Sequence, residues 1–173
     1  MSEKQDILDY IENNKYDYVE MSHRIHERPE LGNEEIFASR TLIDSLKANG
    51  FEIETDIAGH ATGFIARYES NKEGPAIGFL AEYDALPGLG HACGHNIIGT
   101  ASTLGGIALK QVIDDIGGSV VVLGCPAEEG GENGSAKASY VKAGIIDEID
   151  IALMVHPGNE TCLLYTSDAA DDM

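Results

Sequence analysis

The sequence predicts an α/β domain with three layers, in which a mostly parallel sheet lies between flanking helices. Three apolar stretches are typical of buried strands, at residues 76–81, 119–124 and 151–155. Helical patterns alternate with these stretches, and this order of elements produces a parallel sheet. The length of 173 residues fits one such domain with its own hydrophobic core.

Two helices and two strands are predicted before the first buried strand. Apolar residues at roughly helical spacing indicate an amphipathic helix that Pro29 ends. A second helix is expected to be capped by Asn33 and to bury Ile36 among its apolar residues. Alternating apolar residues then predict a half-exposed strand at 51–57, and a further strand is predicted at 63–68.

The second half of the chain alternates helices with the remaining buried strands. A mostly apolar stretch of small residues at 97–116 predicts a helix packed under the sheet, capped by Asn96 and ended by Gly117. A short helix is predicted at 135–142, before the last buried strand. This alternation places the carboxyl ends of the buried strands at one edge of the sheet, where open α/β sheets bind ligands.

The chain is strongly acidic, with thirty acidic against eleven basic residues and a formal net charge of −19. This charge argues against nucleic acid and anionic membrane surfaces as partners. The N-terminal stretch lacks the features of a signal peptide, and the longest apolar runs are too short to cross a bilayer. We therefore expect a cytoplasmic protein. Cys93, Cys125 and Cys162 are an odd number in such a protein, so we expect metal or catalytic roles rather than a disulfide framework.

Reactive side chains follow each of the three buried strands. They are Asp84, Cys93 and His95 after the first strand, Glu128 and Glu129 after the second, and His156 after the third. Gly and Pro residues between them indicate loops. If the strands are parallel, these loops open at the same edge of the sheet, and their side chains can converge there.

The mixture of donor atoms in these loops indicates a metal site. A thiolate from Cys93 and an imidazole from His95, two residues apart, can hold one cation. Glu129 and His156 add an oxygen and a nitrogen donor. This mixed set suits zinc and also accepts manganese.

The neighbouring carboxylates permit a division of labour. One of the two carboxylates, Glu128 or Glu129, can ligate, while the other stays free as a general base that takes a proton from metal-bound water. Asp84 can accept a hydrogen bond from a ligating imidazole and so fix its tautomer. His91 is open to three roles, as a ligand, a substrate contact or a loop brace, and Asn96 is a further candidate for a substrate or loop contact.

Each of these residues also has a purely structural interpretation. Cys93 can be an inert buried thiol, the paired glutamates an exposed acidic turn, and His156 a core histidine at the end of a strand. His60 lies in a Gly-Ala loop and receives no role, and His23 and His26 are expected at the surface or at a helix end. For the reactive residues of the three loops, the position after three separate buried strands favours the functional interpretation.

Four stretches of the chain resemble the M20 family of metallopeptidases and amidohydrolases, and they occur in the family's order. They are HRIHERPELGNEE at 23–35, GFLAEYDALPGLGHACGHN at 78–96, CPAEEGG at 125–131 and MVHPG at 154–158. The resemblance is to the aminoacylase-type branch, and the second stretch is similar to aminobenzoyl-glutamate hydrolases and M20 dipeptidases. The resemblance implies a zinc-exopeptidase-like catalytic domain.

The resemblance further implies a site with two divalent metal ions, zinc or manganese. Carried over by motif, the ligands are Cys93, His95, Glu129 and His156, with Glu128 as the general base and Asp84 as a supporting acid. The implied reaction is hydrolysis of the amide bond of an N-acyl amino acid or a small dipeptide. Full-length members of the family are expected to be homodimers.

The chain departs from the family after His156. It contains no later histidine, whereas the family has a last histidine ligand, and the family's lid or dimerisation domain is absent. We expect an incomplete catalytic domain at 1–161, followed at 162–173 by an artefactual or disordered tail. An uncovered sheet edge and uncovered helices would make the isolated chain poorly soluble.

Two other functions remain open from the sequence. A metal-binding domain without catalytic activity fits the missing ligand and lid. A thiol hydrolase would use Cys93 as the nucleophile and His91 or His95 as its base, but it leaves the paired glutamates without a role. Metal content measured beside hydrolysis of N-acyl amino acids distinguishes these functions.

Overall fold

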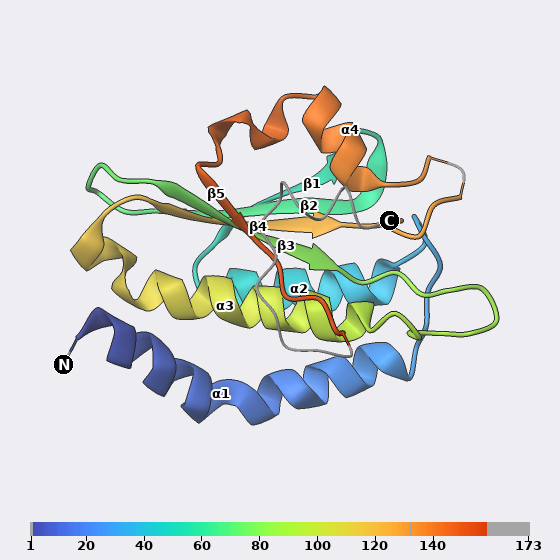
Figure 1. Ribbon diagram of the computed structural model, residues 1–173, viewed down its shortest axis with the longest axis horizontal. Helices are drawn as coiled ribbons and strands as arrows, with labels where there is room; N and C mark the ends of the chain where they lie inside the picture. Colours follow the sequence, from blue (N-terminus) through green and yellow to red (C-terminus); the bar gives the residue numbers. More distant parts are fainter. Residues whose placement is uncertain (1, 132, 159–173) are drawn as a thin grey trace.

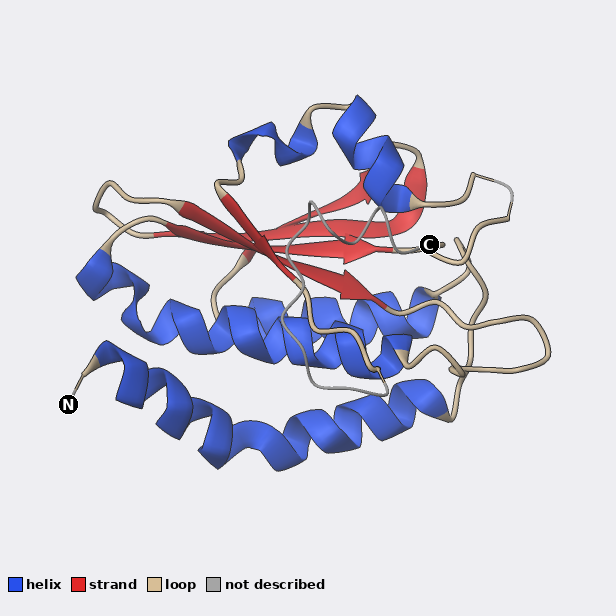
Figure 2. Cartoon of the chain, in the orientation of Figure 1, coloured by secondary structure: helices blue, strands red, loops and turns tan. Residues whose placement is uncertain are grey.

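The computed structural model describes residues 2–131 and 133–158, which form one mixed sheet with helices on both faces (Figures 1 and 2). The predicted α/β class and its three layers are confirmed. The suspected tail at 162–173, with Cys162, lies outside the described residues.

The sheet has five strands in the order β1-β2-β4-β3-β5. Their bounds are β1 (Glu52–Ile57), β2 (His60–Glu69), β3 (Ala76–Glu82), β4 (Ser119–Cys125) and β5 (Ile151–Leu153). β3 pairs in parallel with β4 and β5, as the apolar pattern predicts. β2 pairs antiparallel with both β1 and β4, so it runs opposite to the other four strands. The carboxyl ends of β3, β4 and β5 therefore lie at one edge of the sheet.

The helices divide unequally between the two faces of the sheet (Figure 1). One face is covered by α2 (Ile36–Ala48) and α3 (His95–Ile116), and α1 (Glu3–His26) packs against α3 on the side away from the sheet. The other face carries α4 (Ala136–Lys142) and the 3₁₀-helix η1 (Ile145–Glu148). Each face has its own buried apolar cluster, the larger one under α2 and α3.

Helix α3 lies very close to the sheet because glycines face the strands. A Cβ at Gly99 would lie 2.6 Å from the carbonyl oxygen of Glu82, and one at Gly106 would lie 2.5 Å from Cγ2 of Val122. Both distances are far below van der Waals contact, so a side chain at either position would push the helix away. The first turn of α3 is thereby held against the carboxyl end of β3, where the reactive loop begins.

The predicted helix caps are wrong for α2 and α3. Asn33 has a φ of 63° and does not cap α2, whose first amide groups at Phe37 and Ala38 donate to the carboxylate of Glu30 instead. The position of Asn96 is inside α3, which begins after Gly94. Both caps are predicted from residue type alone, whereas contacts with distant residues also decide where a helix begins and which group accepts its first N–H bonds.

Ile36 and β5 are also more exposed than the apolar pattern predicts. Ile36 is 71% exposed because it opens α2 on the side away from the core. Residues 151–155 form only a three-residue strand at the edge of the sheet, and the side chains of Ile151, Leu153 and Val155 are exposed. An edge strand is covered on fewer sides than a central one, and an apolar run alone does not distinguish the two. No helix in the described part of the chain is long and apolar enough to span a membrane.

Candidate metal centre

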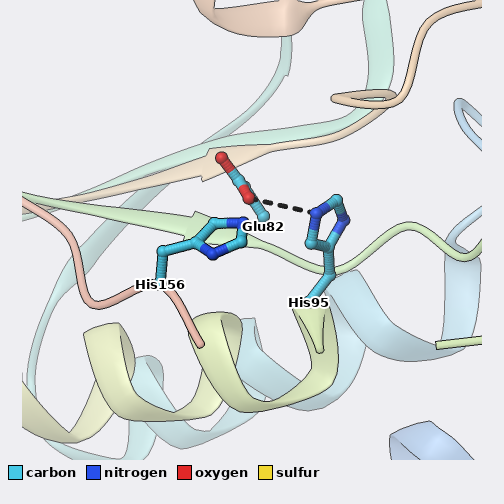
Figure 3. Close-up of side chains that lie close together, drawn as sticks. All are labelled: Glu82, His95 and His156. Carbon is cyan, nitrogen blue, oxygen red and sulfur yellow. Dashed lines mark ion pairs between the residues drawn. The ribbon is translucent and has the colours of Figure 1, made fainter. Parts of the chain in front are cut away.

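The structure brings side chains from the ends of β3, β4 and β5 together. Glu82 is the last residue of β3, His95 the first residue of α3, and His156 follows β5, and their side chains point toward one another (Figure 3). Glu128 and Glu129, which follow β4, face the same imidazole. The convergence that the strand order predicts is present in the structure.

Asp84 fixes the orientation of His95. Its Oδ1 lies 2.8 Å from Nδ1 of His95, and its Oδ2 accepts a hydrogen bond of 3.1 Å from the backbone N–H of Glu129. Because an ionised carboxylate only accepts hydrogen bonds, Nδ1 of His95 carries the proton. The lone pair is then on Nε2, which faces the cluster of carboxylates. Asp84 thus joins the loops after β3 and β4 and sets the tautomer that a metal ligand needs.

Carboxylate oxygens surround Nε2 of His95 without forming a hydrogen bond. The distances are 3.3 Å to Oε2 of Glu82, 3.6 Å to Oε1 of Glu129 and 3.9 Å to Oε2 of Glu128. Nε2 of His95 and Oε2 of Glu82 are buried and have no hydrogen-bond partner among the described residues. Burial alone would lower the pKa of His95, but the hydrogen bond to Asp84 and the nearby carboxylate charges outweigh it and raise that pKa. A cation between these atoms would satisfy both orphaned groups.

The donor atoms fall into two overlapping groups that fit a divalent ion. One group is Glu82, His95 and His156, and the other is Cys93, His95 and Glu129, each with its donor atoms within 4.8 Å of one another. Nitrogen, oxygen and sulfur donors of this kind hold zinc and related metals. Since only Nε2 of His95 is free to ligate, His95 can serve one ion at a time. Two ions would therefore divide the remaining donors between them.

The two described cysteines differ in their surroundings. Cys93 is partly exposed, and a hydrogen bond to Glu129, followed by desolvation and nearby carboxylates, raises its pKa to about 11. Cys125 is buried in the small apolar cluster, and burial raises its pKa to about 12. A thiol with such a raised pKa holds its proton at neutral pH unless a cation replaces that proton.

His156 is an exposed member of the site, as is Glu129. Its Nδ1–H donates to the carbonyl oxygen of Pro157 at 2.7 Å, which leaves Nε2 free to ligate. Its ring stands nearly perpendicular to that of His95, with 6.4 Å between the ring centres. The next residue, Pro157, packs on Gly94, where an added Cβ would lie 2.7 Å from Cγ of the proline. Gly94, with a φ of 77°, therefore allows the loop after β5 to approach the loop after β3.

His91 and Asn96 lie beside the cluster rather than in it. His91 is 7% exposed, and neither of its ring nitrogens has a hydrogen-bond partner in the described part of the chain. It lines a cavity of about 520 Å³ that Cys93 and His156 also line. The amide of Asn96 donates to Oγ of Ser22 at 2.9 Å, which ties α3 to α1. Asn96 thus makes a structural contact between two helices. His91 lines the cavity with unbonded ring nitrogens among the described residues, so it can contact a ligand there.

Glu82, Lys137 and Glu35 also support the site. The sequence places Glu82 among the groups after the first buried strand that can bind a metal or move a proton, without a specific role, and Glu35 only in the first turn of a helix; it predicts nothing for Lys137. Glu82 and Asp84 are two residues apart at the end of a strand, a spacing that places both side chains on one side, so the sequence held a signal for Glu82. Nζ of Lys137 contacts the carboxylates of Glu82 and Glu128. The buried carboxylate of Glu35 accepts hydrogen bonds from the hydroxyl of Thr62 and from the backbone N–H of Ala127.

Two curated relatives cover most of the chain. The chain is 35% identical over 170 residues to a subunit of the p-aminobenzoyl-glutamate hydrolase of Escherichia coli, and the match covers 87% of the chain and 34% of that protein. It is 34% identical over 172 residues to the human Xaa-Arg dipeptidase, with coverage of 87% of the chain and 37% of the relative. The chain thus spans about a third of the length of these relatives. No family model matches the chain.

A solved structure matches the fold. It is the Bacillus subtilis YXEP protein, described as a dinuclear metal binding peptidase from the M20 family. The TM-score is 0.68 at 28% sequence identity, over 79% of this chain and 41% of the other. The relatives, the shared fold and the four sequence stretches agree, and the chain therefore belongs to the M20 family of metallopeptidases and amidohydrolases.

Proposed function

We propose that this protein is a metal-dependent hydrolase that cleaves the amide bond of an N-acyl amino acid or a small dipeptide. The observation that carries the proposal is a pair of buried atoms without a hydrogen-bond partner among the described residues, Oε2 of Glu82 and Nε2 of His95, inside a cluster of carboxylates, a thiol and a second imidazole. The p-aminobenzoyl-glutamate hydrolase and Xaa-Arg dipeptidase names of the relatives support the substrate class.

The residues divide into ligands, a base and an orienting acid. Cys93, His95, Glu129 and His156 would hold two divalent ions, zinc or manganese, with Glu82 as a further donor. When bound, such ions polarise a carbonyl group and lower the pKa of a coordinated water to about 7.

Glu128 is the proposed carrier of the proton in this reaction. Its Oε2 lies 3.9 Å from Nε2 of His95, at the rim of the donor cluster, and its side chain is partly exposed. From this position Glu128 takes the proton of the attacking water and passes it to the nitrogen of the leaving amine. Asp84 keeps His95 in the ligating tautomer during turnover.

A thiol hydrolase receives less support from the geometry. The raised pKa of Cys93 disfavours the thiolate that would act as a nucleophile. In addition, neither the free Nε2 of His95 nor either ring nitrogen of His91 has a hydrogen-bond partner among the described residues, so neither imidazole is hydrogen-bonded to the Cys93 thiol there. We also propose a cytoplasmic location and, from the family resemblance, a homodimeric full-length protein.

Metal content and turnover should be measured together on the purified protein. We expect bound zinc or manganese and hydrolysis of N-acetyl amino acids or dipeptides that a chelator abolishes and added metal restores. Glu128→Gln should keep the metal and lose roughly 10²–10⁴-fold in turnover, because the base is removed. Glu148→Gln, on the exposed 3₁₀-helix η1, is the matched control.

Two outcomes would contradict the proposal in different ways. Stoichiometric metal without turnover on any such substrate would favour a metal-binding domain without catalytic activity. Hydrolysis that resists the chelator and disappears on alkylation of Cys93 would favour the thiol mechanism.

A further inference from the structure

Lys137 extends from α4 into the acidic cluster. Its Nζ lies 2.5 Å from Oε1 of Glu82 and 3.4 Å from Oε1 of Glu128. Glu82 is almost completely buried, and the side chain of Lys137 is about two-thirds buried. A buried ion pair of this kind has a large effect when one partner is removed, because the other charge is left without compensation.

The two oxygens of Glu82 have different partners. Oε1 is taken by Lys137, and Oε2 faces Nε2 of His95 without a hydrogen bond. With one oxygen paired with the ammonium group, the carboxylate of Glu82 is oriented so that its other oxygen points into the donor cluster. Without it, the carboxylate could rotate about its last bond and lose that orientation.

Lys137 also lies between carboxylates that repel one another. Glu82, Asp84, Glu128 and Glu129 all lie around His95. Among the described residues, Lys137 is the one lysine or arginine that forms an ion pair with any of these four. Its single charge is shared by a carboxylate of the donor group and the carboxylate assigned as the base, and it holds the two in a fixed relation.

We propose that Lys137 is a positioning residue that aims Glu82 at the metal and holds Glu128 in place as the base. This inference rests on the proposed function and assigns a residue outside the ligand set to that same site. It predicts that Lys137 acts on metal binding through Glu82 and on turnover through Glu128.

The first test is zinc affinity, measured by calorimetric titration of the metal-free protein with zinc. Lys137→Met keeps the apolar part of the side chain and should weaken binding by about 10–100-fold, as changes outside the ligand set commonly do. Lys137→Arg restores a cation and should recover most of the affinity. Lys142→Met, on the exposed end of the same helix, is the matched control and should bind like the wild type.

A double-mutant cycle separates positioning from a general loss of structure. Lys137→Met combined with Glu82→Gln should bind zinc no more weakly than Glu82→Gln alone, because the lysine has lost the carboxylate through which it acts. Additive losses would overturn the proposal, as would unchanged affinity in Lys137→Met. Failure of Lys137→Arg to recover affinity, in a variant with the far-UV circular dichroism of the wild type, would also contradict it.

Turnover at saturating zinc gives the second readout. Lys137→Met should lower kcat with little change in KM, because the base is displaced while the substrate site is kept. A wild-type protein that binds no metal would overturn the proposed function and this inference together. A wild-type protein that binds zinc and hydrolyses substrate, beside a Lys137→Met variant that does both equally well, would overturn only the role of Lys137.

Discussion

His95 and His156 supply the two imidazoles of the site, but they are held in opposite ways. His95 is buried at the start of α3, its Nδ1 is bound by Asp84, and its Nε2 faces carboxylates. His156 is exposed after a short edge strand, and its described hydrogen bond is to the carbonyl of its own neighbour. The candidate metal centre therefore has one imidazole fixed in the core and a second on an exposed segment after a three-residue strand.

The largest effect should come from removing the buried imidazole. His95→Ala takes a donor from both groups of ligands, whereas His156→Ala leaves Cys93, His95 and Glu129 as a complete set. We expect His95→Ala to lose bound zinc after dialysis, and His156→Ala to retain about one ion per chain. Elemental analysis of the dialysed proteins measures this, and equal metal content in the two variants would break the comparison.

A smaller effect is expected when the support of His95 is changed while the ring stays. Asp84→Asn should lower zinc affinity by about 10–100-fold. A carboxylate can only accept the hydrogen of Nδ1, whereas an amide can also donate to Nδ1 through its NH₂ group, so the tautomer of His95 with a free Nε2 is no longer fixed. Asp44→Asn, an exposed acid on α2, serves as the control. Calorimetric titration with zinc compares the two variants. Wild-type affinity in Asp84→Asn would show that Asp84 does not need to fix the orientation and tautomer of His95 for zinc to bind.

The packing of the segment that carries His156 against the loop after β3 can be changed at Gly94. Gly94→Ala places a methyl group against Pro157, and Gly88→Ala, in the same loop with a φ of 73°, meets nothing within 4 Å. Both substitutions should cost about 1–2 kcal/mol of stability from the left-handed backbone, but only Gly94→Ala should also weaken zinc binding several-fold. Denaturant unfolding and zinc titration of both variants test this, and equal zinc affinity in the two would show that the proline contact does not matter.

The smallest effect concerns His60, which is buried like His95 but has different partners. The comparison of the two rings shows that burial alone does not set the pKa of His95. His60 has no carboxylate at its ring nitrogens, which lie 2.7 Å from Oδ1 of Asn33 and 2.9 Å from Oγ of Ser139. Burial lowers its pKa below the ordinary 6.5, opposite to the direction for His95.

The native state therefore binds fewer protons at His60 than the unfolded state once the pH falls below about 6.5. The contribution of His60 to the free energy of unfolding is complete above that pH and is lost as the pH falls toward the lowered value. His60→Gln should flatten the decline in stability between pH 7 and pH 5, as measured by urea unfolding of the metal-free protein. An unchanged slope in His60→Gln would contradict the lowered pKa.

The sequence predicts the architecture well because the relevant signals are local. Apolar runs identify β3 and β4, and reactive residues directly after a strand identify the edge where the site forms. The convergence of Asp84, His95, Glu129 and His156 follows from the parallel direction of three strands.

What the sequence does not predict depends on partners that are distant along the chain. Glu82 reads as the end of a strand, and its partner Lys137 is 55 residues away. Glu35 supports the acidic loop across 92 residues. The exposure of β5 depends on its place at the edge of the sheet, which the residues 151–155 themselves do not encode.

The edge position of β5 has a consequence for how the protein behaves in concentrated solution. The strand pairs with β3 on one side, and in the described residues no strand pairs with its other side. In the part of the chain that the structure describes, the backbone groups on this side and the exposed Ile151 and Leu153 form a template to which another extended segment can add. Association of chains by strand addition would draw the segment before His156 into a new sheet, so the metal content of the protein should depend on its concentration.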